Sequence, residues 1–181
     1  MPDIQSKAKS IVIYTDGGCR NNPGAGGYGV VLLYKEHRKE LSGGFALTTN
    51  NRMEISAAIA GLQALKESCS VTLYSDSKYL VDSVMQGWAK KWQAKGWRRN
   101  KNQLTKNADL WVVLLELCEQ HEVNFKWVKG HAGDKENERC DELANLAIEQ
   151  ENLPDDEGYL NLEEAMQKVK GTAEATLGLF V

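Results

Sequence analysis

Residues 10–29 read SIVIYTDGGCRNNPGAGGYG, and this stretch decides the fold class of the chain. The short apolar, β-branched run 10–14 is typical of a buried strand, which leads to Asp16 at its carboxyl end. After the glycine-rich turn, residues 27–34 and 38–47 are predicted to form an antiparallel pair of strands. Because ligands bind at strand ends in α/β sheets, Asp16 is the first candidate for a functional residue.

Helix and strand patterns alternate in the rest of the chain. Apolar residues recur at helical spacing over 52–67, with Asn50 or Asn51 as the N-cap, so we expect Glu54 in the first turn of a helix. A second short strand, 71–74, ends at Asp76. The next predicted elements are a helix capped by Ser77, a helix over 108–121 and a strand over 123–127. The loop 129–134 then leads into a last helix of this region, and this helix carries Asp141. The fold class is therefore α/β, with a mixed sheet because no helix separates the first three strands.

The formal net charge of −3 hides a strong segregation of charge. Residues 88–106 hold seven basic groups and no acid, which leaves the rest of the chain with 15 basic and 25 acidic residues. Trp88, Trp92 and Trp97 alternate with these basic residues, and this composition is typical of surfaces that bind a nucleic-acid backbone. The same rings at these spacings also suit a protein core, and we expect both roles to be partly filled.

Length and composition favour one globular domain, which we place at residues 1–152 with a basic protrusion at about 88–106. No stretch approaches the ~18 apolar residues of a membrane span, so we expect a cytoplasmic protein, and we expect a monomer. Four cysteines without metal-ligand spacing argue against a zinc site. Residues 153–181 are predicted to be a tail with a short helix, which contacts either its own domain or another protein.

Four acids come from separate elements: Asp16, Glu54, Asp76 and Asp141. Each alone is better explained as a helix cap or turn residue. Together they would repel one another, and such a cluster is tolerated when hard divalent cations such as Mg²⁺ lie between the carboxylates. His131, between two glycines in the loop before Asp141, is suited to moving a proton near neutral pH, although a solvated loop histidine has the same pattern.

Four runs in unbroken order resemble the bacterial type 1 ribonuclease H family: TDGGCRNNPGAGGYG (15–29), TNNRMEISAAI (49–59), YSDSKYL (74–80) and WVKGHAGDKENERCDELAN (127–145). The resemblance implies a five-stranded mixed sheet flanked by helices. It also implies an endonuclease that cuts the RNA strand of RNA/DNA hybrids with two Mg²⁺ ions, or Mn²⁺, giving 5′-phosphate and 3′-hydroxyl products.

The resemblance also assigns roles to residues. Asp16, Glu54, Asp76 and Asp141 would be the catalytic metal ligands, and His131 would assist proton transfer or product departure. Cys19, Asn22, Asn50 and Asn51 match positions that contact the hybrid, where 2′-hydroxyls identify RNA. The DNA strand would be held by Thr49 and by four residues of the protrusion, namely Trp88, Lys90, Lys91 and Trp92.

Two departures from the family pattern stand out: Lys78 replaces a common glutamine, and Asp134 with Lys135 follows the His131 loop. Two other functions share some of these features. A DNA strand-transfer or exonuclease module would carry the same acid cluster, and a non-catalytic hybrid-binding module would carry the same basic protrusion. The Thr49–Asn51 run argues against the first, and the full set of four carboxylates argues against the second.

Overall fold

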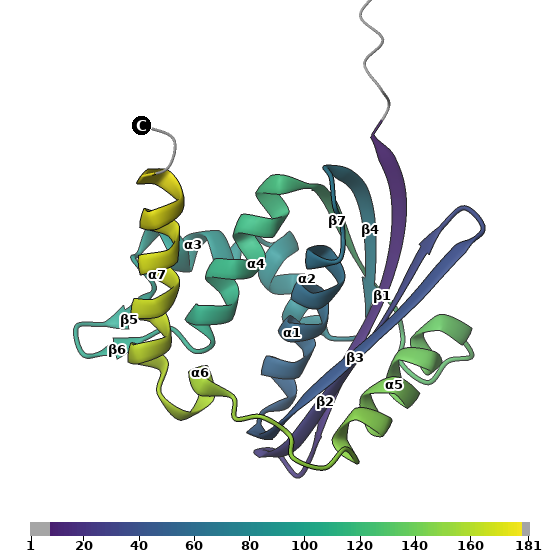
Figure 1. Cartoon of the computed structure of the whole chain (residues 1–181). Helices are drawn as coiled ribbons and strands as arrows, with labels where there is room; N and C mark the ends of the chain where they lie inside the picture. The colour runs from purple at the N-terminus through teal and green to yellow at the C-terminus, as the bar shows by residue number, and fades with distance from the viewer. Residues whose placement is uncertain (1–7, 179–181) are drawn as a thin grey trace, which may run out of the picture.

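The protein is built on one five-stranded mixed sheet with the strand order β3-β2-β1-β4-β7 (Figure 1). This computed structural model describes the backbone of residues 8–178 and the side chains of residues 8–172. The first three strands pair antiparallel, whereas β1 pairs parallel with β4, and β4 pairs parallel with β7. The strands are β1 (Lys9–Arg20), β2 (Gly24–Tyr34), β3 (His37–Thr48), β4 (Cys69–Ser75) and β7 (Glu122–Trp127). The predicted α/β class and mixed sheet are confirmed.

Helices cover both faces of this sheet (Figure 1). On one face, α1 (Asn50–Gln63) and α4 (Ala108–Gln120) enclose the main core, to which Ile13 and Val30 belong. Val31, which alternation turns to the opposite face, packs against α5 (Lys135–Ile148). The short helix α2 (Lys78–Met85) follows β4 and begins with Ser77 as its N-cap, as predicted.

The start of α1 differs slightly from the sequence prediction. Thr49, rather than Asn50 or Asn51, is the N-cap, and its hydroxyl accepts a hydrogen bond from the Arg52 backbone N–H at 3.3 Å. Threonine and asparagine are near-equivalent caps, so local pattern does not choose between neighbours. The helix therefore begins at Asn50, and Glu54 lies just beyond the first turn.

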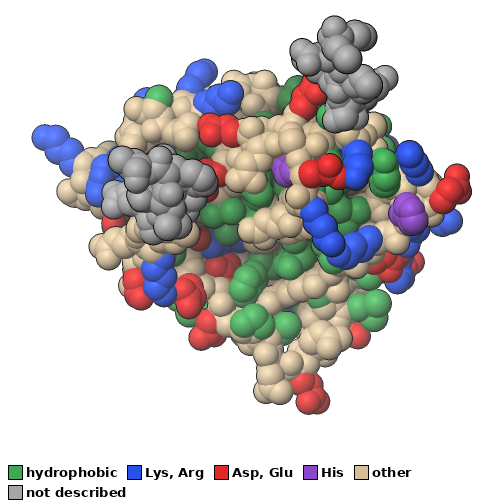
Figure 2. All heavy atoms as spheres, turned by 45° about the horizontal axis from the view of Figure 1, so that its top comes forward, with side chains coloured by type: hydrophobic (Ala, Val, Ile, Leu, Met, Phe, Trp, Pro, Cys, Tyr) green, Lys and Arg blue, Asp and Glu red, His purple; other side chains and the backbone are tan. Residues whose placement is uncertain are grey.

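The basic protrusion is a helix followed by a small hairpin. It comprises α3 (Trp88–Ala94), β5 (Arg98–Asn100) and β6 (Gln103–Leu104). All seven of its basic residues are exposed, and Figure 2 shows blue side chains at the edge where the hairpin lies. Trp97 is buried, Trp92 packs against Trp111 at 5.7 Å between ring centroids, and Trp88 is 38% exposed. The tryptophans thus divide between core and surface, as expected.

The tail forms two helices, α6 (Glu157–Leu160) and α7 (Leu162–Gly178), and it docks on the rest of the chain. The Ala46 backbone N–H donates to the Pro154 carbonyl at 2.9 Å, and Met166 of α7 is buried in the core beside α4. The expected contact with its own domain is therefore present, whereas the division at residue 152 stays a prediction. The predicted apolar end, 177–181, falls outside the residues whose side chains are described.

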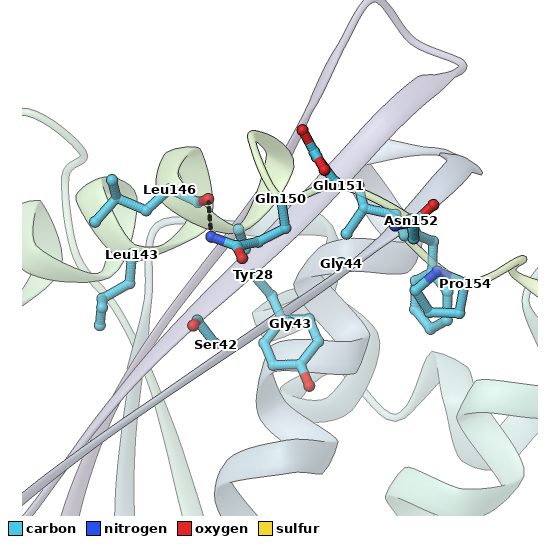
Figure 3. Close-up of a pocket in the computed structure, with 13 residues that line it drawn as sticks. Tyr28, Ser42, Gly43, Gly44, Leu143, Leu146, Gln150, Glu151, Asn152 and Pro154 are labelled. Carbon is cyan, nitrogen blue, oxygen red and sulfur yellow. Dashed lines mark hydrogen bonds between the residues drawn. The ribbon is translucent and has the colours of Figure 1, made fainter.

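A groove of about 770 Å³ lies where α5 ends over β2 and β3 (Figure 3). Tyr28, Gly43 and Leu146 line it, and the Gln150 side-chain amide donates to the Leu146 carbonyl at 3.4 Å. None of the site residues predicted from the sequence lines this groove. Among the described residues, none of the helices combines the length and the apolar character that crossing a membrane requires.

Candidate active site

Three of the predicted carboxylates converge from three different elements. Asp16 lies in β1, Glu54 in α1, and Asp76 directly after β4. One oxygen from each lies within 4.8 Å of the other two. Asp16 and Glu54 are each 8% exposed, and Asp76 is half-buried. Asp76 follows the end of β4, as predicted, but β1 continues to Arg20 because its pairing with β2 runs on, so Asp16 lies within the strand and not at its end. Parallel pairing of β1 with β4 stops at Thr15 and Ser75, which places Asp16 and Asp76 together.

Two glycines allow this convergence. A Cβ atom at Gly17 would overlap the backbone of Met53 and Glu54, so only glycine lets β1 approach α1 this closely. A Cβ atom at Gly130 would overlap the Asp76 carboxylate, so the loop that carries His131 lies directly against the cluster. Both glycines therefore set the spacing of the acids.

The surroundings of the cluster favour the protonated, uncharged form of its acids. Burial, reinforced by the neighbouring Asp76, raises the pKa of Asp16 to about 7. Burial and the charge of Asp16 raise the pKa of Glu54 well above its ordinary value. Burial also raises the pKa of Asp76, against the opposing effects of Asn137 and His131. Glu54 Oε2 is buried without a hydrogen-bond partner among the described residues.

The remaining two predicted residues lie around this group of three. Asp141, half-buried on α5, is not within the 4.8 Å group, but its charge raises the pKa of Asp16 and of Asp76 after the larger effect of burial. His131 is exposed at φ 52° in its loop, close enough to influence Asp76. The structure thus brings all five residues to one region.

This donor set fits a hard divalent cation. Carboxylate oxygens are the ligands that Mg²⁺ and Mn²⁺ accept, and the orphaned Glu54 oxygen is a buried acceptor that a cation would satisfy. A cation between the acids would also remove the repulsion that raises their pKa values. The residues able to hold it are Asp16, Glu54 and Asp76, with Asp141 beside them.

The predicted hybrid-contacting residues form a connected ridge beside the acids. The Cys19 backbone N–H donates to Asn50 Oδ1 at 2.8 Å, and the Asn50 backbone N–H donates to Asn22 Oδ1 at 3.1 Å. These bonds join the glycine-rich turn to the start of α1. Burial raises the pKa of the Cys19 thiol to about 11, so the thiol stays protonated at neutral pH. Asn51 is exposed beside them.

Sequence reasoning missed a buried ionic cluster at the start of α1. The Arg52 guanidinium donates to both carboxylate oxygens of Asp109, at 2.9 and 2.7 Å, and from Nε to Asp156 Oδ2 at 2.6 Å. Thr48 Oγ1 lies 2.6 Å from the same Asp156 oxygen. Burial lowers the pKa of Arg52, but the hydrogen bonds and charges of Asp109 and Asp156 outweigh this effect and raise the pKa above its ordinary value. Asp156 therefore ties the tail to the helix that carries Glu54.

The tail also reaches the rim of the site. A cavity of about 410 Å³ is lined by Asn22, Thr49 and Asn51, together with Lys106, Asn107 and Tyr159. Lys106 and Asn107 were not among the predicted site residues. Three predicted contact residues thus share one concave surface with the base of the protrusion and the first turn of α6.

Comparisons with known proteins agree with this geometry. A family profile described as RNase H matches residues 8–149. The Ribonuclease H of Rippkaea orientalis is 65% identical over 158 residues, which cover 87% of this chain and 97% of that protein. Ribonuclease HI of Synechocystis is 56% identical over 157 residues, covering 86% and 98%.

Solved structures give the same assignment. LC9-RNase H1, a type 1 RNase H with the type 2 active-site motif, is similar with a TM-score of 0.71 at 29% identity, over 78% of this chain and 72% of that chain. LC11-RNase H1, crystallised in complex with RNA/DNA hybrid, gives a TM-score of 0.59 at 29% identity, over 76% and 96%. With its sheet, its carboxylates and these relatives in agreement, the chain belongs to the bacterial ribonuclease H family.

Proposed function

We propose that this ribonuclease H hydrolyses the RNA strand of RNA/DNA hybrids at the cluster of Asp16, Glu54 and Asp76, with two Mg²⁺ ions. The observation that carries the proposal is the convergence of three carboxylates, two buried and one half-buried, with an unsatisfied Glu54 oxygen. The relative LC11-RNase H1 binds an RNA/DNA hybrid, and this supports the substrate class.

The four carboxylates hold and orient the metal ions in this proposal. Asp16, Glu54 and Asp76 would hold the ions, and Asp141, whose charge acts on Asp16, would add a further carboxylate beside them. Bound divalent cations supply an activated water and stabilise the leaving oxygen, and Mn²⁺ can replace Mg²⁺. Attack of water on the scissile phosphorus, with departure of the 3′-oxygen, leaves a 5′-phosphate and a 3′-hydroxyl. Because Asp16 and Glu54 are buried, their carboxylates would interact strongly with bound cations.

His131 moves a proton in this scheme. Its loop lies against Asp76, and its ring is exposed. In this proposal the ring donates a proton to the leaving 3′-oxygen or helps the product depart.

Substrate recognition falls to two surfaces. The ridge of Cys19, Asn22, Asn50 and Asn51 reads the minor groove, where 2′-hydroxyls identify the RNA strand. Thr49 and the protrusion hold the DNA strand, because the protrusion presents exposed cations beside a partly exposed ring. The protrusion residues with this role are Trp88, Lys90, Lys91 and Trp92.

A substrate panel with and without Mg²⁺ tests the proposal. We expect cleavage of the RNA in a hybrid, no cleavage of duplex DNA, and no cleavage in EDTA. Asp16→Asn removes cleavage but keeps hybrid binding. Cleavage of duplex DNA would favour an exonuclease or strand-transfer module, and tight hybrid binding without cleavage by the wild-type protein would favour a binding module. Full activity in Asp16→Asn would remove the proposed metal site.

A further inference from the structure

Lys78 and Trp127 form a cation–aromatic pair at the edge of the carboxylate cluster. The Lys78 Nζ lies 5.1 Å from the centroid of the Trp127 ring. The indole Nε1 donates to the Asp76 backbone carbonyl at 3.0 Å, which fixes the ring relative to the cluster. Lys78 is exposed and Trp127 is 45% exposed, so both present a face to any molecule that reaches Asp76.

Stability of the fold does not explain this pair. Lys78 is the first residue of α2, where a cation opposes the helix dipole at a cost of about 0.3–1 kcal/mol. An exposed cation–π contact returns about 0.5–1 kcal/mol, so the two effects nearly cancel. Lys78 makes no ion pair with any residue that the structure describes. Its ammonium is therefore left available for a partner outside the chain.

The position of Lys78 identifies that partner. Only Ser77 separates it from Asp76, and two steps along the chain span at most about 7 Å. A strand whose scissile phosphate sits among the carboxylates must pass the start of α2, with the adjoining phosphate next to it. The acids repel that adjoining phosphate, and a free ammonium at this place offsets the repulsion.

We propose that Lys78, held against Trp127, binds the backbone phosphate next to the scissile phosphate on the cleaved strand. The inference rests on the proposed function and deepens it, because it adds a charge contact where the family pattern carries a neutral glutamine. Trp127 acts as a positioning residue for the ammonium.

Steady-state cleavage of a hybrid over a series of KCl concentrations tests the contact. Lys78→Met raises KM about three- to tenfold with kcat near the wild-type value, and the slope of log KM against log salt becomes shallower by about 0.7–0.9. Lys78→Arg keeps the charge and restores both. The matched control is Lys35→Met, since Lys35 lies 5.3 Å from the Tyr34 ring centroid, in the β2–β3 turn. An unchanged slope in Lys78→Met, or an equal change in Lys35→Met, overturns the inference.

Hybrids with one uncharged methylphosphonate locate the contact. For the wild-type protein, the substitution next to the scissile bond raises KM by the same factor as Lys78→Met, and for Lys78→Met it adds nothing further. Equal losses for both proteins at every position would contradict the contact, as would a melting temperature of Lys78→Met that falls together with kcat. Absence of any cleavage by the wild-type protein would instead overturn the proposed function itself.

Discussion

Two clusters of buried acids meet at the start of α1, and their electrostatics are opposite. Asp109 and Asp156 flank Arg52, which donates hydrogen bonds to both. Two residues further along the helix, Glu54 joins Asp16 in a cluster where buried acids face one another. In this second cluster burial and like charge raise the pKa values of the acids, and one Glu54 oxygen has no partner among the described residues.

The difference separates a structural role from a functional one. Buried charges persist in proteins when they are paired or bind a metal. Arg52 supplies the pairing inside the first cluster, so that cluster needs nothing from outside the chain. Among the described residues, no lysine or arginine forms an ion pair with the second cluster, and a divalent ion is the partner that its geometry accepts. Changes to each cluster should therefore have different consequences.

The largest expected effect is on catalysis, from Glu54→Gln. The change removes one metal-binding charge without altering size, and kcat on a hybrid should fall at least about a thousandfold. Hybrid affinity and melting temperature in EDTA should not fall, because Glu54 Oε2 has no hydrogen-bond partner among the described residues and burial disfavours the charge of this acid. Single-turnover kinetics measure the loss of cleavage, and a hybrid-binding assay with thermal melts measures affinity and stability. Substantial residual turnover would contradict the assignment of Glu54 as a metal ligand.

Arg52→Met should break the paired cluster and lower the free energy of unfolding by about 3–5 kcal/mol, because it leaves two buried carboxylates without a counter-charge. Urea denaturation measures this. The matched control is Arg20→Met, which removes an exposed ion pair with Glu149 and should cost less than about 1 kcal/mol. Equal losses in the two variants would show that the Arg52 cluster is not the stabilising feature we describe.

The unpaired cluster should make the metal-free protein sensitive to pH. The folded-state pKa of Asp16 is about 7, above its ordinary value of 3.8, so the folded protein binds the proton more tightly. Its contribution to stability is therefore present below about pH 4 and is lost as pH rises through 7.

Asp16→Asn removes this dependence. In EDTA, the variant should gain stability over the wild-type protein as pH rises from 4 to 8, reaching about 4 kcal/mol. Thermal melts across this range measure the difference, and Asp155→Asn, at an exposed acid, controls for net charge. A difference that stays constant with pH would show that Asp16 is not strained by its neighbours.

The smallest expected effect comes from removing α7. A chain ending at Asn161 keeps Asp156 but loses Met166 from the core, so it should lose about 2 kcal/mol of stability while kcat stays nearly intact. Deleting 153–181 also removes a partner of Arg52 and should destabilise the protein further. Denaturation and steady-state kinetics of the two truncations measure this, and equal stabilities would contradict a role for Asp156 in the paired cluster.

Local pattern was enough to predict the sheet and the candidate acids. Two short apolar runs and one helix start singled out Asp16, Asp76 and Glu54, because these signals lie within a few residues of each acid. The end of the first strand was predicted too early, since β1 continues past Asp16 to Arg20. The cluster of Arg52 with Asp109 and Asp156 has no comparable pattern in the sequence near its members. Arg52 and Asp156 are 104 residues apart, and Asp156 lies in a segment, PDDEG, whose composition is that of a linker. Pairing at this distance depends on the fold alone.

The protrusion shows the same limit on a smaller scale. The alternation of tryptophans with basic residues predicted that some rings lie in the core and others bind nucleic acid. The spacing did not show which tryptophan has which role. Trp97 became core, and Trp92 packs on Trp111, because the hairpin and α4 close over them. Likewise, Lys78 was recognised as a departure from the family pattern, while its contact with Trp127 depends on β7 lying beside β4.

Magnesium binding by the unpaired cluster tests the central claim most directly. Isothermal titration at pH 8, with wild-type protein and Glu54→Gln, measures it without relying on turnover. We predict binding by the wild-type protein, accompanied by a higher melting temperature as Mg²⁺ is added, and at least about tenfold weaker binding by Glu54→Gln. Equal affinities in the two proteins, or no binding by the wild-type protein, would contradict the account.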